Sequence, residues 1–265
     1  MTDWPNLMDE LDAWAAAGRV ATLWWRDDDA VEPTPALERL LGLTAAQHVP
    51  VCLAVIPARA TDGLARRLAA ARPPVTPVQH GFAHRNHAPT AEKKAELGAD
   101  RPAAAVLEEL ARGQARMTAL FGTEYMAVLV PPWNRIAAEL IPALPGLGFT
   151  GLSTYRRRAA AQAAPGLTQV NSHVDIMRWE APRGFLGQAE ALDLLIGELQ
   201  ARRRGEVGAG EPTGLLTHHL AHDEACWAFL ESLLGVLAEH PAVRFAAVGE
   251  IFPAPGAARQ TRGMA

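Results

Sequence analysis

Short apolar segments alternate with longer Ala- and Leu-rich stretches along most of the chain, and this alternation limits the possible folds more than any other feature. Strands that alternate with helices in this way are typical of βα units around a parallel sheet or barrel. We predict strands at 19–25, 51–56, 76–79, 126–130, 151–153, 169–171, 213–216 and 243–247, and helices at 34–47, 60–71, 103–120, 136–144, 188–203 and 225–239. The pattern therefore predicts an α/β protein.

The positions of proline and glycine favour a single domain. Prolines and glycines fall between the predicted elements or at helix starts, as turn residues do, and no long linker or internal repeat interrupts the run. We predict one domain over residues 1–252, followed by a tail at 253–265.

Composition excludes several classes of partner. The chain is 49% hydrophobic and 20% charged with a formal net charge of -4, which is ordinary for a globular enzyme. Its arginine clusters are short and diluted by acids, so no basic face for nucleic acid is indicated. No stretch approaches the ~18 to 20 apolar residues of a membrane span, and the N-terminus lacks the basic and apolar regions of a signal peptide. We expect a cytoplasmic protein without nucleic-acid or membrane partners, and the sequence leaves its oligomeric state open.

Polar residues gather directly after several predicted strands. Three aspartates follow the first strand, His80 follows the third, residues 131–135 follow the fourth and His218 follows the seventh. The carboxyl ends of strands build the active site in βα architectures. We therefore expect these clusters to converge on one rim.

The aspartate cluster comprises Asp27, Asp28 and Asp29. Three adjacent carboxylates repel one another, so such a run at the end of a buried strand needs a cation or a hydrogen-bond network to neutralise it. The alternative is an acidic helix start before Pro33, where carboxylates meet the positive end of the helix dipole.

The second cluster contains His80, His84 and His87. Histidines four positions apart lie on the same face of a helical turn, roughly 5 to 6 Å apart at Cβ, and can hold one metal ion together. His87 is a spare candidate at the next turn. Three imidazoles within eight positions favour a metal site over isolated surface histidines.

The clusters after the fourth and seventh strands offer substrate and proton-transfer groups. Trp133, Asn134 and Arg135 follow a Pro-Pro turn and form a candidate substrate wall, although a turn with a buried tryptophan is the alternative. His218 reaches the rim from an apolar strand, and imidazole is suited to proton transfer near neutral pH.

Three further residues are less certain members of the site. His219 and His222 either act at the rim or only pair locally with Asp223. Asp175, in the segment that also holds Trp179, either orients a catalytic partner or is a surface-loop acid.

Taken in order, the clusters resemble the signature of the polysaccharide deacetylase family, also described as NodB-homology or carbohydrate esterase 4-like. Its pattern is TFDDG, HSxxH or HTxxH, an RxPxG-like element, an acid-Trp element and LxH. The most specific match is His80-Gly-Phe-Ala-His84, and Leu216-Thr217-His218 fits LxH. The resemblance covers most of the chain and implies a distorted, seven-stranded (β/α) barrel.

The resemblance also implies roles for individual residues. Asp28 is the expected general base, His218 the expected general acid, and Asp29 with His80 and His84 the expected ligands of one divalent metal ion. Zinc is the expected metal, with cobalt, nickel, manganese and iron as alternatives.

One ambiguity of register and two departures from the pattern concern the same motifs. With Arg26 in place of the family's threonine the roles fall as above, whereas a register one residue earlier gives them to Asp27 and Asp28. Val130 stands where the family has arginine, so the usual pairing of arginine with aspartate is absent unless Arg26 or Arg135 supplies it. Gly81 replaces the serine or threonine of the second motif. We expect substrate contacts from Arg26 and Arg135 as well as from Trp133 and Asn134.

These residues predict a metal-dependent hydrolase that removes an acetyl group from an N-acetylated sugar or a related amide. Its partner is then a small-molecule or oligosaccharide substrate. The first alternative is a cyclic-amide or ureide hydrolase of the allantoinase-like branch, and the second is a non-catalytic, carbohydrate-binding relative.

Overall fold

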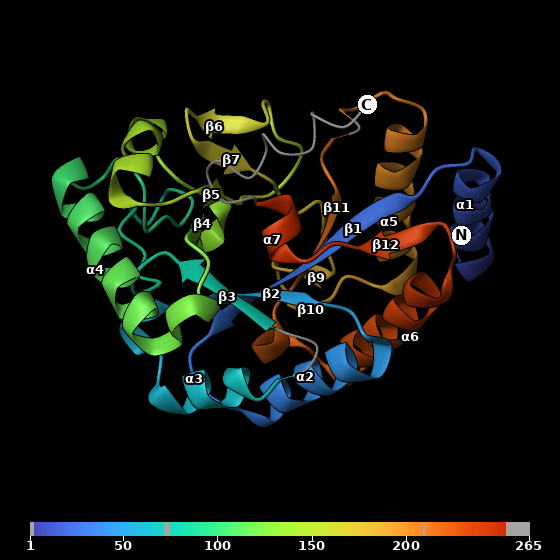
Figure 1. Ribbon diagram of the computed structural model, residues 1–265, viewed down its shortest axis with the longest axis horizontal. Coiled ribbons are helices and arrows are strands. Elements are labelled where there is room, and N and C mark those ends of the chain that lie inside the picture. The colour runs from blue at the N-terminus through green and yellow to red at the C-terminus, as the bar shows by residue number, and fades with distance from the viewer. Residues whose placement is uncertain (1–2, 72–74, 209, 253–265) are drawn as a thin grey trace, which may run out of the picture.

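The computed structural model describes residues 3–71, 75–208 and 210–252, so the predicted tail at 253–265 lies outside the described residues. A curled sheet of ten strands forms its centre, and helices lie around the outside of the curve (Figure 1). The main strands are β1 (Ala21–Ala30), β2 (Val51–Val55), β3 (Val75–His80), β4 (Val128–Val130), β5 (Gly151–Leu152), β7 (Leu167–Gln169), β8 (Val174–Asp175), β11 (Thr213–Thr217) and β12 (Val243–Phe245), with β6 (Gln162–Ala164) at one edge.

The strand order explains why the sheet is an open barrel. Along the sheet the order is β6-β7-β5-β4-β3-β2-β1-β11-β8, with β12 beside the start of β1. Every pair is parallel except β6 with β7. The edge strands β6 and β8 are not neighbours in this order, so the curl stays open. A separate hairpin, β9 (Met177–Arg178) with β10 (Gly184–Phe185), follows β8.

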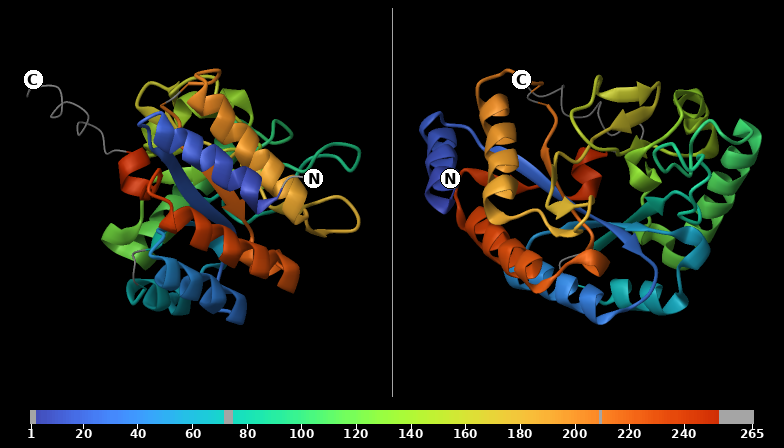
Figure 2. Two further views of the ribbon diagram at one scale, coloured as in Figure 1. Left: turned by 90° about the vertical axis from the view of Figure 1, so that its right-hand side faces the viewer. Right: turned by 180° about the vertical axis from the view of Figure 1, so that it is seen from behind.

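The helices follow the predicted pattern closely. They are α1 (Trp4–Ala16), α2 (Pro35–Gln47), α3 (Asp62–Ala69), α4 (Ala103–Phe121), α5 (Gln188–Arg203), α6 (Glu224–Glu239) and α7 (Val248–Ile251), with short 3-10 helices η1 (Pro57–Arg59), η2 (Gly122–Glu124), η3 (Pro132–Asn134), η4 (Ala138–Ala143), η5 (Pro145–Leu147) and η6 (His219–Ala221). Side-chain oxygens of Thr34, Thr61 and Asp223 accept backbone N–H bonds at the starts of α2, α3 and α6, which satisfies donors that a helix start leaves free. Helix α1 packs beside α5 at the outer edge (Figure 2).

The predicted α/β barrel class is confirmed, and three details differ. The sheet has ten strands rather than seven, because the additional strands are only two or three residues long and carry no periodic signal. Where an α-helix was predicted over 136–144, residues Ala138–Ala143 form the 3-10 helix η4, because in an α-helix the ring of Pro142 would clash with the carbonyl four residues earlier. The first strand runs on to Ala30 and includes the aspartates that were expected to follow it.

The alternation of side chains along β1 sorts its residues onto two faces. Trp24 packs in the cluster inside the curl with Cys52, Ala54 and Val78, whereas Trp25 packs in the cluster beneath the helices. Successive strand residues point to opposite faces, so Arg26 and Asp28 share the inner face with Trp24. Asp27 follows Trp25 on the outer face.

A bulge ends the regular part of β1. Between Asp27 and Ala30 the register with β2 shifts, so that three steps along β1 face two steps along β2. Asp29 in this bulge has a φ of 77°, in the left-handed region that non-glycine residues seldom adopt. Bulges re-aim side chains beside active sites, and this one turns Asp29 toward the histidines after β3.

Candidate metal and catalytic site

Asp29, His80 and His84 come together at the carboxyl end of the sheet. The Nε2 atoms of both histidines lie 3.2 Å from the same oxygen, Oδ1 of Asp29. One donor atom from each residue lies within 4.8 Å of the other two. The three predicted ligands are therefore adjacent in space.

The two histidines do not lie on the predicted helical turn. His80 is the last residue of β3, and His84 lies in the loop that follows. This loop has no helical residues, and in it Gly81 has a φ of 54° and His84 a φ of 56°. Their rings lie 5.1 Å apart, centroid to centroid. Two left-handed residues, not helical spacing, bring the imidazoles together, so the helical explanation of this motif was wrong.

His80 has a fixed orientation. Its Nδ1–H donates to the carbonyl oxygen of Val130 on the neighbouring strand at 2.9 Å, and the side chain is 2% exposed. With Nδ1 bound to the backbone, Nε2 is the ring nitrogen that faces Asp29 Oδ1, at 3.2 Å. Such a bond to the far ring nitrogen is the usual way in which a protein fixes a metal-binding histidine.

The charged groups of this cluster shift one another's pKa values. Burial opposes ionisation of Asp29, but the close contact and charge of His80 and the charges of His218 and His84 hold the pKa of Asp29 below its usual range. Burial alone would lower the pKa of His80, yet Asp28 and Asp29 together raise it. For His84, burial and the neighbouring His80 lower the pKa. The cluster thus combines an ionised carboxylate with at least one neutral imidazole.

These donors suit a divalent transition metal. One carboxylate and two imidazoles form a common three-ligand set that leaves further positions open to water or substrate. Asp29 Oδ1 is buried and lacks a hydrogen-bond partner within the described residues, although both Nε2 atoms face it. A cation among these three atoms would satisfy that oxygen.

Asp28 lies beside this group and is held by Arg26. The guanidinium Nε lies 2.9 Å from Asp28 Oδ1, and Nη2 donates to Oδ2 at 3.1 Å. Arg26 also donates to Ser153 Oγ at 2.7 Å and to Asn134 Oδ1 at 2.6 Å. The arginine missing from position 130 is thus replaced by one two residues before the aspartate.

The expected substrate contact from Arg26 does not fit the structure. The side chain of Arg26 is fully buried, and its donors are engaged with protein acceptors. A buried guanidinium with these partners orients Asp28 and cannot reach a ligand on the rim.

His218 approaches Asp28 from the end of β11. Its Nε2 lies 3.9 Å from Asp28 Oδ2, and its ring packs edge-to-face against Trp179 at 4.5 Å between centroids. The indole Nε1–H of Trp179 donates to Asp175 Oδ2 at 2.8 Å. Burial raises the pKa of Asp175 despite the nearby charge of His218. The structure therefore places the predicted residue Asp175 behind the tryptophan that covers His218.

Asp27 belongs to a separate, fully buried network on the outer face. Its Oδ1 accepts from His219 Nδ1 at 2.5 Å, and its Oδ2 accepts from Thr217 Oγ1 at 2.6 Å and from the His219 backbone N–H at 3.0 Å. Burial would raise the pKa of Asp27, but His219 lowers it. These bonds join the ends of β1 and β11. The alternative register, with Asp27 as base, has no support in this arrangement.

Of the remaining predicted residues, two lie beside the cluster and two are bound elsewhere. Trp133 packs against the ring of His84 at 4.4 Å between centroids, and Asn134 contacts Arg26. Arg135 points to the carbonyl of Lys94 and is bound there. His87 pairs through its backbone with Ala95, and it does not join the group of potential metal ligands.

His222 supports the loop after β11. Its Nε2 accepts the backbone N–H of His218 at 3.3 Å, and its ring packs against Trp227 at 4.5 Å. Burial lowers the pKa of His222 to about 4. The neutral imidazole therefore holds the backbone of His218.

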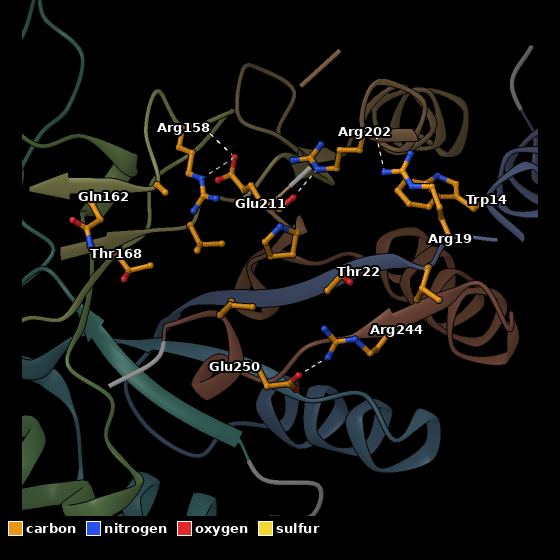
Figure 3. Close-up of a pocket in the computed structure, with 16 residues that line it drawn as sticks. Trp14, Arg19, Thr22, Arg158, Gln162, Thr168, Arg202, Glu211, Arg244 and Glu250 are labelled. Carbon is orange, nitrogen blue, oxygen red and sulfur yellow. Dashed lines mark hydrogen bonds and ion pairs between the residues drawn. The ribbon is translucent and has the colours of Figure 1, made fainter. Parts of the chain in front are cut away.

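A cavity of about 680 Å³ lies at the other end of the sheet and contains none of the predicted site residues (Figure 3). Thr22, Thr168 and Pro212 place it at the amino ends of β1, β7 and β11. Its arginines are bound within the protein: Arg202 donates to the carbonyl of Glu211, and Arg244 pairs with Glu250. The carboxyl-end cluster is therefore the candidate site.

No protein-family model and no curated protein sequence matches the chain. Solved structures do match. A protein from Mycobacterium smegmatis assigned as a polysaccharide deacetylase superposes with a TM-score of 0.67 at 17% identity, over 88% of this chain and 89% of that one. The chain has the fold of the polysaccharide deacetylases. A family 4 carbohydrate esterase from Streptomyces lividans, in complex with acetate, gives a TM-score of 0.56 at 15% identity, over 86% and 93% of the two chains.

A third match with the polysaccharide deacetylase fold is a family 4 acetyl xylan esterase from Clostridium thermocellum, solved with a cobalt ion. It has a TM-score of 0.52 at 13% identity and covers 87% of this chain and 90% of that one. The resemblance inferred from the sequence motifs is thus confirmed at the level of the fold.

Proposed function

We propose that the protein is a metal-dependent hydrolase that removes an acetyl group from an N-acetylated sugar or a related amide. The observation that carries this proposal is the position of Asp28. It lies between Arg26 and His218 and immediately precedes Asp29, which contacts both His80 and His84. A base, an acid and a set of metal ligands on one rim are the groups that amide hydrolysis requires.

The cation would be held by Asp29, His80 and His84, and zinc is our first choice. A divalent cation bound there would polarise the acyl carbonyl and make water a better nucleophile. The cobalt ion in the C. thermocellum esterase supports a metal in this fold.

Asp28 is placed to remove the proton of the attacking water. Arg26 fixes the direction of the carboxylate through two contacts at 2.9 and 3.1 Å. A carboxylate held in this way loses little orientation freedom on reaction, which is the advantage of a prearranged base. The buried guanidinium itself takes no part in proton transfer.

His218 is placed to protonate the leaving nitrogen. An amine leaves as a neutral molecule only if it receives a proton, because an amide anion is a very poor leaving group. His218 Nε2 lies 3.9 Å from Asp28 Oδ2, so both groups are close enough to act on the same amide bond. Proton removal and proton delivery are therefore assigned to different residues.

Two tryptophans flank the reacting groups and would form walls for a sugar ring. Trp133 packs on His84, and Trp179, which is 42% exposed, packs on His218. Exposed aromatic faces beside polar groups are suited to carbohydrate rings. The acetate bound to the S. lividans esterase is consistent with an acetyl product in this fold.

The test is the release of acetate by the full chain. The protein is freed of metal with a chelator, reloaded with zinc or cobalt, and assayed on N-acetylglucosamine oligomers and on cyclic ureides. Metal-dependent acetate release that is lost in Asp28→Asn supports the proposal. Ammonia or ring-opened product from a ureide alone would assign the cyclic-amide activity instead, and the absence of metal binding would reject both.

A further inference from the structure

A buried glutamate lies behind the loop that carries His80 and His84. Glu96 is 1% exposed, and its carboxylate accepts three backbone N–H groups. Oε2 accepts from Phe82 at 3.0 Å, and Oε1 accepts from Ala83 at 2.8 Å and from Arg85 at 3.3 Å. One carboxylate thus binds the loop on both sides of His84.

The replacement of serine or threonine by Gly81 is what makes room for this carboxylate. A Cβ atom on Gly81 would lie 2.1 Å from Glu96 Oε2 and 2.5 Å from Cδ of Pro132. No side chain fits at that position while Glu96 is in place. The absence of a side chain at position 81 and the carboxylate of Glu96 behind it are therefore two parts of one arrangement.

The backbone of His84 needs such support. Its φ of 56° is unfavourable for a residue with a side chain, so the conformation persists only where neighbouring interactions enforce it. The N–H groups immediately before and after His84 both bind Glu96 Oε1. Without these bonds the residue would relax toward a common conformation, and its imidazole would turn away from Asp29.

We propose that Glu96 is the positioning residue of the metal site: it holds His84 in the left-handed conformation that directs Nε2 at Asp29. This inference rests on the proposed metal-dependent function. Loss of an outer partner of a metal ligand typically weakens metal binding by roughly 10- to 100-fold. Glu96 reaches no substrate or metal itself, so its effect is on ligand geometry.

The experiment measures cobalt binding to the metal-free full chain by competition with a coloured chelator, together with the visible spectrum of bound cobalt. The variant Glu96→Gln keeps the size of the side chain but places an amide N–H₂ against backbone donors. We expect its cobalt affinity to fall by about 10- to 100-fold and its spectrum to change. The control is Glu92→Gln, an exposed residue of the same loop, which is expected to behave as wild type.

A second variant tests the same contact without altering Glu96. Gly81→Ala forces a methyl group against Oε2 and should reproduce the loss of affinity and the changed spectrum. Its matched control is Gly18→Ala, since Gly18 also has a positive φ, 64°, but a Cβ there would meet nothing within 4 Å. If Glu96→Gln folds too poorly to assay, Gly81→Ala against Gly18→Ala decides the question.

The outcomes separate this inference from the proposed function. Cobalt binding by wild type with unchanged affinity and spectrum in Glu96→Gln and Gly81→Ala would overturn the role of Glu96 and leave the metal-dependent function intact. No cobalt binding by wild type would overturn both.

Discussion

Arg26 and Asp28, two residues apart on β1, form a buried ion pair in which the guanidinium meets both carboxylate oxygens. Strand β4, which is separated from β1 by β3 and β2, ends in Val130 and contributes no charged side chain to the pair. The pair is therefore local in the sequence.

Arg26→Met should lower both stability and turnover. Breaking a buried ion pair by removing one partner costs about 3 to 5 kcal/mol, because the other charge stays buried without compensation. Urea unfolding measures the loss of free energy, and acetate release measures turnover. Arg67→Met is the matched control, because it breaks an exposed pair with Glu38 and should change stability by less than about 1 kcal/mol. Equal stability of the two variants would contradict the role of Arg26.

The two aspartates of the bulge should separate metal binding from catalysis. Asp28→Asn removes the base and should reduce acetate release by on the order of 10²- to 10⁴-fold while metal is retained. Asp29→Asn should lose the metal, because it replaces the carboxylate that faces both Nε2 atoms with an uncharged amide. Metal content after gel filtration, measured beside turnover, checks both. Metal loss in Asp28→Asn with metal retained in Asp29→Asn would reverse the assignment.

Trp179→Ala should affect substrate use more than stability. The ring covers His218 but is 42% exposed, so little buried surface is lost, whereas one wall of the site and the N–H donated to Asp175 disappear. We expect the fall in kcat/KM to be several times larger than in Trp179→Phe, which keeps an aromatic face. Wild-type kcat/KM in Trp179→Ala would exclude this tryptophan from the site.

Acid should destabilise the metal-free protein through His222. Its pKa is lowered from 6.5 to about 4 by burial, so the unfolded chain binds this proton more readily than the folded one. The stabilising contribution of the neutral ring is present above about pH 6.5 and is lost as the pH falls toward 4. His222→Gln keeps an acceptor but does not titrate, so its melting temperature should fall less over this interval. Parallel curves for the two proteins would contradict the prediction.

Much of the fold followed from the sequence because its signals are local. Apolar runs such as Val51–Val55 and capped helices such as Pro35–Gln47 appear where periodicity and turn residues place them. Strands of two residues such as Val174–Asp175 carry no such signal. They form because a neighbouring strand, here β11, supplies their hydrogen-bond partners. Pro142 is the sequence signal that distinguishes the 3-10 helix η4 from the predicted α-helix.

The site was predictable in its residue types and less so in its geometry. Spacing alone did not reveal that Asp29 and His84 adopt left-handed conformations, which depend on the bulge and on the loop. The role of Glu96 had no signal, because it lies outside every motif and acts through backbone groups. The sequence shows Arg26 in place of the family's threonine. The burial of its side chain follows from which face of β1 it points to, and the pairing register of β1 decides that.

Because Arg26, Asp28 and Asp29 all come from β1, half of the proposed chemistry belongs to a strand that is paired on both sides. Its partners are β11 on one side and β2 and β12 on the other. Amide protons in such a position exchange with solvent only when most of the structure opens, whereas surface segments open locally at far lower cost. The exposed segment that carries Trp179 can therefore open locally while the carboxylates remain in register.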